Sequence, residues 1–253
     1  MDLIDVSESL GVTERGFTLD VAGAQVPGLL WTPTGASGPL PLVLMGHGGS
    51  QHKRTETLLA RARRFVRRLG FAVAAIDAPG HGDRATPEER ERRVEALRSR
   101  IEGRRRPDPT VVREIVARSA LAVPEWKATL DALLPVVEGG PVGYWGVSMG
   151  TAIGVPFVAD EPRIVAAVFG LNGALTGDGL LTDAARRITI PVEFTVQSDD
   201  ELVDREAALA LFDAFASTEK TLHLNPGGHL EVPAFEAESW QAFFDRHLKG
   251  LAS

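Results

Sequence analysis

Cysteine is absent from this sequence of 253 residues. Its absence excludes disulfide bonds, a catalytic thiolate and metal sites with cysteine ligands. Long apolar runs are absent too. A membrane-spanning helix needs roughly 18 such residues, whereas runs such as IVAAVFGL at 164–171 have the length of a strand. The acidic start, MDLIDVSESL, lacks the apolar core of a signal peptide. These absences favour a cytoplasmic protein with no membrane contact.

An excess of positive charge is also missing. The chain has 27 Lys and Arg against 34 Asp and Glu, which gives a net charge of −7. A protein with this balance has no overall attraction for nucleic acids or anionic membranes. No internal repeat, low-complexity tract or Gly/Ser linker divides the chain. We therefore expect one domain over residues 1–253.

Short apolar segments of strand length alternate with helical patterns. They are PLVLMG at 41–46, FAVAAID at 71–77, PVGYWG at 141–146, IVAAVFGL at 164–171, PVEFTV at 191–196 and TLHL at 221–224. Two earlier strand-like segments, 17–21 and 26–31, precede them. Buried strands that alternate with helices predict an α/β fold, with a mostly parallel sheet covered by helices on both faces.

One stretch, from 84 to about 124, interrupts this alternation because it holds no strand candidate. The segment TPEE at 86–89 has the form of a capping box with proline at the first helical position. Val94, Leu97 and Ile101 then make a narrow apolar stripe. We interpret residues 84–124 as a helical cap inserted in the single domain, with its stripe packed on the sheet.

The segment GYWGVSMG at 143–150 places a serine between two glycines, directly after a strand. A strand that turns sharply into a helix holds such a serine in a strained backbone conformation, and Gly146 and Gly150 avoid collisions around it. The turn exposes the Ser148 hydroxyl and aims the helix N-terminus, which favours an anion, towards it. In this position the pattern indicates a nucleophilic serine.

A serine hydroxyl needs a base to activate it, and the base needs a carboxylate to orient it. Of the six histidines, His229 follows Pro-Gly-Gly in a loop after a strand, where open α/β sheets place their sites. His223 lies within that strand and is expected to pack. The loop after 191–196 offers three adjacent carboxylates. We favour Asp200 as the acid, with Asp199 as the second candidate.

These motifs resemble those of the α/β-hydrolase superfamily, in its group of small esterases and dienelactone-hydrolase-like enzymes. The resemblance rests on HGG at 47–49, DAPGHGDR at 77–84, GVSMG at 146–150, SDDELV at 198–203 and GGHLEVP at 227–233. It implies an eight-stranded, mostly parallel sheet with an antiparallel early strand, and it supports Asp200 as the acid. Dienelactone hydrolases use a cysteine where this chain has Ser148, which favours ester hydrolysis here.

Two N–H donors are needed for the oxyanion of an acyl-transfer reaction. The residue after the nucleophile, Met149, supplies one. The resemblance points to Gly49 for the other, with Ser50 as the alternative. We also consider Ser50 and His52 as substrate-binding residues, because the trio His52-Lys53-Arg54 could meet a substrate carboxylate at the pocket mouth.

The predicted function is that of a serine carboxylesterase, which cleaves small-molecule esters through Ser148, Asp200 and His229. The same triad serves peptidases, lactonases, thioesterases and C–C bond hydrolases, and the same fold serves non-catalytic ligand-binding proteins. The sequence leaves these alternatives open. No cofactor or metal is expected, and the sequence leaves a homodimer as open as a monomer.

Overall fold

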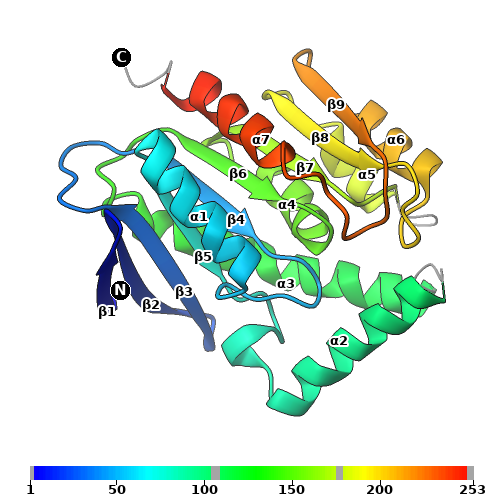
Figure 1. Cartoon of the computed structure of the whole chain (residues 1–253), viewed down its shortest axis with the longest axis horizontal. Helices are drawn as coiled ribbons and strands as arrows, with labels where there is room; N and C mark the ends of the chain where they lie inside the picture. The colour runs from blue at the N-terminus through cyan, green and yellow to red at the C-terminus, as the bar shows by residue number, and fades with distance from the viewer. Residues whose placement is uncertain (1–2, 104–108, 175–178, 250–253) are drawn as a thin grey trace.

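The computed structural model describes residues 3–103, 109–174 and 179–249. They form a nine-stranded sheet with the strand order β1-β2-β3-β5-β4-β6-β7-β8-β9 (Figure 1). The strands are β1 Leu3–Ser9, β2 Val12–Val21, β3 Ala24–Pro33, β4 Leu42–Gly46, β5 Ala72–Ile76, β6 Val142–Gly146, β7 Ile164–Gly170, β8 Val192–Gln197 and β9 Lys220–Asn225. The helices are α1 Glu56–Leu69, α2 Pro87–Glu102, α3 Pro109–Leu133, α4 Met149–Ala159, α5 Leu180–Ala185, α6 Arg205–Ala214 and α7 Glu236–Phe244.

The sheet is mostly parallel, as the alternating pattern predicts. Strands β5, β4, β6, β7, β8 and β9 run parallel, whereas β1, β2 and β3 pair antiparallel, and β3 joins β5 in the antiparallel sense. The predicted α/β fold is confirmed, but the expected number of eight strands is wrong. The ninth strand, β1, lies at the edge and pairs only with β2. Its residues Ser7, Glu8 and Ser9 are exposed, so the sequence there carries no apolar run.

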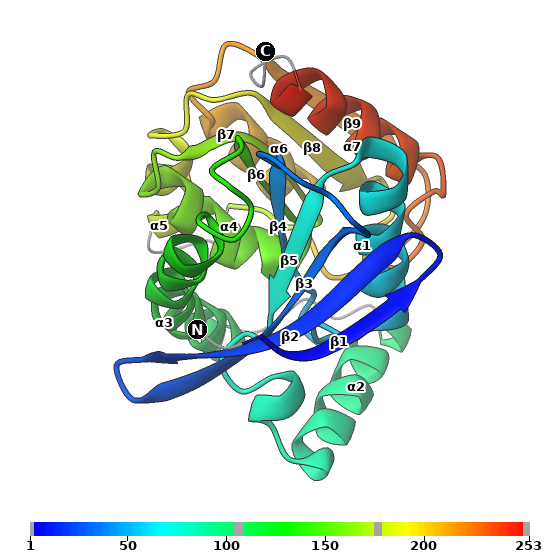
Figure 2. The same cartoon turned by 90° about the vertical axis from the view of Figure 1, so that its left-hand side faces the viewer.

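Helices cover both faces of the sheet (Figure 2). The side chains of β4 point alternately to the two faces of the sheet and so divide the core into two parts. Leu42 and Leu44 belong to one helix layer, and Val43 and Met45 belong to the other. The first layer contains α3, α4, α5 and α6, and the second contains α1 and α7. Among the described helices, none is long and apolar enough to cross a membrane.

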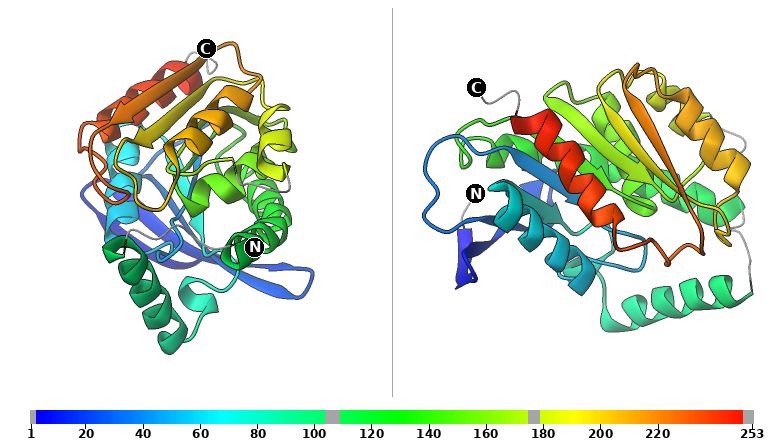
Figure 3. Two further views of the ribbon diagram at one scale, coloured as in Figure 1. Left: turned by 90° about the vertical axis from the view of Figure 1, so that its right-hand side faces the viewer. Right: turned by 45° about the horizontal axis from the view of Figure 1, so that its top comes forward.

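The stretch from 84 to 124 contributes α2 and the first part of α3. Helix α2 begins with the predicted capping box, in which Thr86 accepts from the Glu89 N–H. It lies at one end of the molecule, outside both helix layers (Figures 1 and 3). No residue of α2 is buried, and Val94 is 46% exposed. Leu97 and Ile101 are half-buried. Contrary to the expectation, the apolar stripe is not part of the core on the sheet.

Helix α3 extends well beyond the expected end of the cap. Its second half is buried against the sheet through Ala122, Trp126, Leu130 and Leu133, although Pro124 lies inside it. The polar sequence GRRRPDP at 103–109 predicts a break between two helices, and residues 104–108 of it lie outside the described residues.

Candidate active site

Ser148 stands at the sharp turn between β6 and α4. Its backbone has φ 58° and ψ −120°, a conformation that residues other than glycine rarely adopt. A Cβ on Gly146 would lie 2.8 Å from the Gly150 carbonyl oxygen, and one on Gly150 would lie 2.7 Å from the Gly46 carbonyl oxygen. Both glycines are thus required by close backbone contact, as the pentapeptide predicts.

Two long-range contacts hold this strained residue. The Ser148 N–H donates to the Gly170 carbonyl at 2.8 Å, and the Asn172 side chain donates to the Ser148 carbonyl at 2.9 Å. Both partners lie at or just beyond the end of β7, the next strand of the sheet. Asn172 is a residue that the sequence analysis missed, because no motif links position 172 to the serine.

The three side chains proposed from the sequence form one chain of hydrogen bonds. Ser148 Oγ lies 2.9 Å from His229 Nε2, and His229 Nδ1 lies 2.8 Å from Asp200 Oδ2. The carboxylate can only accept, so Nδ1 carries the proton and Nε2 is left to accept from the hydroxyl. Only 6% of the His229 side chain and 4% of the Asp200 side chain are exposed. The histidine is therefore held in the tautomer that a general base requires.

The two candidate aspartates have different partners. Asp200 Oδ1 accepts from the N–H groups of Leu202 and Val203, both at 2.9 Å, which leaves Oδ2 for His229. Asp199 instead receives the Gly227 N–H at 3.2 Å. Asp200 is thus the aspartate beside the imidazole, and Asp199 ties its own loop to the loop that carries His229.

The loop of His229 is held by side chains that the sequence analysis did not identify. Gln197 donates to the carbonyls of Pro226 and Gly228 at 3.2 and 3.3 Å, and Glu201 accepts from the His229 N–H at 3.1 Å. These contacts join the ends of β8 and β9, so the loop of the acid and the loop of the base are tied to each other.

The expected oxyanion donors lie beside each other. A Cβ built on Gly49 would lie 3.9 Å from the Met149 Cβ. Among the described residues, no hydrogen-bond acceptor is found for the N–H of either Gly49 or Met149. The Gly49 carbonyl is held from behind by His81 Nε2 at 2.8 Å. Both N–H groups are therefore available to a ligand next to Ser148.

The basic trio at 52–54 does not form the expected surface. Lys53 is buried and pairs with Asp77 and Asp83, and Arg54 pairs with Glu14 at 2.7 Å. His52 Nδ1 accepts from the Arg54 N–H at 3.2 Å. Two of the three side chains are thus committed to ion pairs. Ser50 and His52 are half-buried. Within the described ranges, neither side chain is hydrogen-bonded to Ser148, Asp200 or His229.

His47 lies beneath this loop. Its Nε2 accepts from the Ala78 N–H at 3.0 Å, so Nδ1 carries the proton and donates to the Gly48 carbonyl at 2.9 Å. Burial lowers the pKa of His47 to about 4, which keeps the ring neutral. His47 and His81 therefore link the loop at 48–50 to the loop at 77–84 by hydrogen bonds.

Comparisons with known proteins agree with this architecture. No family model and no curated protein matches the chain. A polyethylene-glycol-bound cold-adapted esterase from an Arctic intertidal metagenomic library is 36% identical, over 98% of this chain and 100% of that chain, with a TM-score of 0.80. A zinc-bound esterase structure, also from an Arctic intertidal metagenomic library, is 34% identical over the same shares, with a TM-score of 0.74.

More distant structures share the fold. An acetyl xylan esterase from Paenibacillus sp. R4 is 17% identical over 98% of this chain and 88% of that chain, with a TM-score of 0.74. A dienelactone hydrolase from Anabaena variabilis is 20% identical over 94% and 99%, with a TM-score of 0.64. The chain belongs to the α/β-hydrolase superfamily, in its group of esterases and dienelactone-hydrolase-like enzymes. Within that group it is a carboxylic ester hydrolase.

Proposed function

We propose that this enzyme cleaves small carboxylic esters through an acyl-enzyme on Ser148. One observation carries the proposal: the unbroken chain of hydrogen bonds from Ser148 through His229 to Asp200, at 2.9 and 2.8 Å, with the serine at a strained strand-to-helix turn. The 36% identity to an esterase over 98% of the chain supports the ester as substrate class.

Acylation begins when the Ser148 oxygen attacks the ester carbonyl carbon. His229 Nε2 takes the hydroxyl proton, and the ring becomes an imidazolium. Asp200 holds Nδ1–H and stabilises that positive charge without itself taking the proton. The imidazolium then gives its proton to the leaving alcohol, and the acyl group stays on Ser148.

The negative charge that develops on the carbonyl oxygen is met by the N–H groups of Met149 and Gly49. Met149 opens α4, so its N–H points outward from the helix N-terminus, where the dipole favours an anion. Preorganised donors of this kind each contribute about 10²–10³ in kcat. Water then attacks the acyl-enzyme with His229 again acting as the base, which releases the carboxylic acid.

We further propose that residues 84–124 act as a cap within a single domain that spans residues 1–253. Arg90 and Arg93 donate to the carbonyls of Gly82 and Gly80, which anchors α2 to the loop at 77–84. His81 of that loop holds the Gly49 carbonyl. These contacts support a cap that is linked to the loop at 48–50, which carries the Gly49 N–H. Arg90 and Arg93 of the cap are the anchors.

Metal ions are not part of the proposed reaction. Each step of the reaction is assigned to a side chain or a main-chain N–H group of this chain. No step uses a metal ion such as the zinc bound in the structure of the Arctic esterase. We therefore propose that ester turnover continues after a chelator has removed bound metal. Loss of turnover that zinc restores would contradict this proposal.

The first experiment is hydrolysis of p-nitrophenyl esters of increasing acyl length, with wild type beside Ser148→Ala. We expect fast turnover of short esters and a loss of at least about 10³-fold in the variant, with an unchanged thermal melt. A serine-directed phosphonate should add one adduct at Ser148. Turnover that survives in Ser148→Ala would refute the assignment of the nucleophile.

Two further proposals concern the protein in the cell. We propose a cytoplasmic location, which the cysteine-free composition supports, and cell fractionation tests it.

We also propose a homodimer, for which the exposed Val94 of α2 and Leu121 of α3 offer apolar surface. Light scattering of the purified protein would give twice the mass of 27.1 kDa if this is right.

A further inference from the structure

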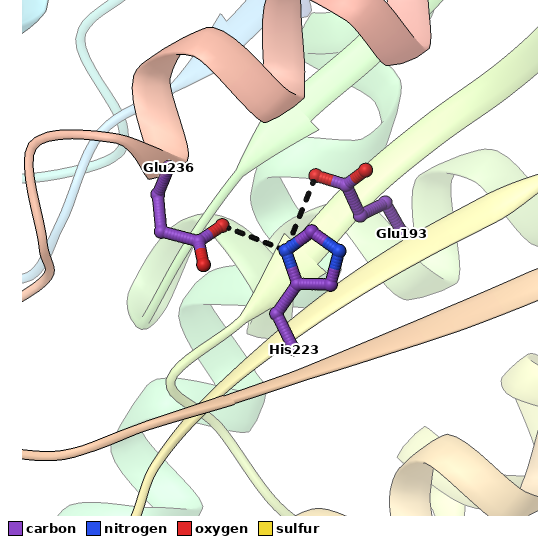
Figure 4. A group of neighbouring side chains, drawn as sticks. All are labelled: Glu193, His223 and Glu236. Carbon is purple, nitrogen blue, oxygen red and sulfur yellow. Dashed lines mark hydrogen bonds and ion pairs between the residues drawn. The ribbon is translucent and has the colours of Figure 1, made fainter.

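A second group of chemistry-bearing side chains lies outside the proposed active site (Figure 4). Glu193 comes from β8, His223 from β9, and Glu236 is the first residue of α7. In the parallel register Glu193 lies opposite Thr221 and His223 lies opposite Thr195. Because side chains alternate along strands, Glu193 and His223 project from the same face of the sheet.

The three side chains converge on one point. His223 Nδ1 lies 2.9 Å from Glu236 Oε2 and 4.0 Å from Glu193 Oε1, and these three atoms all lie within 4.8 Å of one another. Figure 4 shows both carboxylates directed at the same ring nitrogen. The sequence analysis expected His223 only to pack, because its two partners lie on other elements, at positions 193 and 236.

Each carboxylate is oriented by a second side chain. Asn225 donates to Glu236 Oε1 at 2.8 Å, and Ser239 donates to Glu193 Oε2 at 3.2 Å. The other oxygen of each group is the one that faces His223. Outer partners of this kind fix the direction of metal ligands in proteins.

Within the described part of the chain, one ligand atom of this group lacks a hydrogen-bond partner. Glu193 is 5% exposed, and its Oε1 atom, which faces His223, is buried with no hydrogen bond to any described residue. Two ionised carboxylates carry a charge of −2, and a buried charge without a counter-ion is strongly unfavourable. A divalent cation would neutralise this charge.

We propose that Glu193, His223 and Glu236 bind a divalent transition-metal ion of the zinc type. Zinc takes imidazole nitrogen at about 2.0–2.1 Å and carboxylate oxygen at about 2.0–2.2 Å. Tetrahedral ligands at such lengths lie about 3.3–3.5 Å from one another, and the observed separations of 2.9 and 4.0 Å lie on either side of that value. A small rotation of the Glu193 side chain brings the third ligand into place.

Two of the three proposed ligands, Glu193 and His223, border a cavity. This cavity of about 170 Å³ is lined by Glu193, His223 and Ser239, together with Arg246 and His247. It gives an ion a path into the site and leaves room for a water ligand. Binding through Nδ1 requires the single proton of the neutral His223 ring to lie on Nε2, which is a change of tautomer.

The position of the site suggests a stabilising role. Beyond Glu193, strand β8 leads to Asp200, and beyond His223, strand β9 leads to His229. Glu236 follows the loop of His229 and begins α7. An ion bound to these three elements would therefore clamp the base of the loops that carry the acid and the base, without touching the reacting atoms.

The test uses the full chain, freed of metal with a chelator and titrated with zinc chloride. We expect one zinc ion per chain by calorimetry. At zinc concentrations about 100 times Kd, Tm should rise by about 5 °C. Glu193→Gln should bind at least about 100-fold more weakly and lose the shift in Tm. Glu219→Gln is the matched control, since Glu219 lines the same cavity and pairs with His247; it should behave as wild type.

Two further measurements keep this proposal separate from the proposed catalysis. Ser148→Ala should bind zinc as wild type does, whatever its esterase activity. Cobalt chloride should give the visible absorption of a tetrahedral site with nitrogen and oxygen ligands, and Glu236→Gln should remove that absorption. Absence of binding in wild type, or equal binding in wild type and Glu193→Gln, would overturn the proposal.

Discussion

The Tyr144 hydroxyl donates to the main-chain carbonyl of Gly150 at 2.7 Å, directly beneath the turn that carries Ser148. Tyr144 is the only tyrosine of the chain and is completely buried. Burial raises the pKa of its hydroxyl far above the ordinary value, so the group always donates. The ring also fills the space next to Gly146 and Gly154, where a Cβ would lie 2.8 and 2.1 Å from Tyr144 atoms.

Replacement of Tyr144 by phenylalanine tests whether its hydroxyl stabilises the turn that carries Ser148. Tyr144→Phe keeps the ring and leaves the buried Gly150 carbonyl without its donor, which should lower the free energy of unfolding by about 1–3 kcal/mol. Because the turn holds Ser148 in a strained conformation, kcat for a short p-nitrophenyl ester should also fall, while KM should change little. Urea unfolding and steady-state kinetics measure the two effects. An unchanged unfolding curve would show that the hydrogen bond contributes nothing.

The two adjacent aspartates give a matched pair of variants. Asp200→Asn should lower kcat/KM by about 10³–10⁴-fold, because an amide beside His229 Nδ1 no longer fixes the tautomer. Asp199→Asn removes a carboxylate of the same loop that contacts the Gly227 N–H, and should cost less than about tenfold. Kinetics with p-nitrophenyl acetate separate them. If Asp199→Asn were the more damaging of the two, the assignment of the acid would be wrong.

The segments that the sequence predicted best are those that are buried on both faces. Strands β4, β5 and β6 have every residue buried, so each appears as an uninterrupted apolar run. The edge strand β1 pairs on one side only and has a polar sequence, which is why it was missed. The expected cap ends at about residue 124, yet α3 continues through Pro124 to Leu133. The packing of its buried second half outweighs the lost hydrogen bond.

In the candidate site, some residues belong to local sequence motifs, whereas others are brought together only by tertiary structure. Ser148 and His229 lie in local motifs whose spacing carries their geometry. The choice between Asp199 and Asp200 depends on which carboxylate turns towards His229. Two adjacent positions in a loop leave this open by themselves, and the resemblance of SDDELV at 198–203 to the superfamily supports Asp200. Asn172 contacts Ser148 only because β6 and β7 pair in the sheet. Contacts of this kind are set by tertiary structure and have no sequence motif.

Two ion pairs of neighbouring residues, Lys53 with Asp77 and Arg54 with Glu14, differ in burial. The Lys53 and Asp77 side chains are 5% and 0% exposed, and Asp77 also accepts the main-chain N–H groups of Lys53 and Asp83. Lys53→Met leaves a buried carboxylate without its counter-ion, so the free energy of unfolding should fall by about 3–5 kcal/mol.

The matched control for that variant is Arg54→Met. Arg54 is 46% exposed in its pair with Glu14, and exposed pairs contribute about 1 kcal/mol or less. Urea unfolding of both variants measures the difference. Equal losses of stability in Lys53→Met and Arg54→Met would mean that burial of the ion pair has no energetic consequence.

The buried His47 predicts a dependence of stability on pH. Burial lowers its pKa from 6.5 to about 4, so between these values the unfolded chain binds a proton that the folded chain does not. Stability from this group is therefore present above pH 6.5 and is lost as pH falls towards 4. The loss amounts to about 3 kcal/mol at most, from about 1.4 kcal/mol per pKa unit.

Comparison with His47→Gln isolates this contribution. The amide of glutamine has both a donor and an acceptor for the carbonyl of Gly48 and the N–H of Ala78, but it does not titrate. The other titratable side chains are present in both proteins, so the difference between the two curves reports on His47 and its contacts. The free energy of unfolding of wild type should therefore fall more steeply between pH 6.5 and 4.5 than that of the variant. Parallel curves from urea unfolding at these pH values would show that His47 is protonated in the folded enzyme as readily as in the unfolded chain.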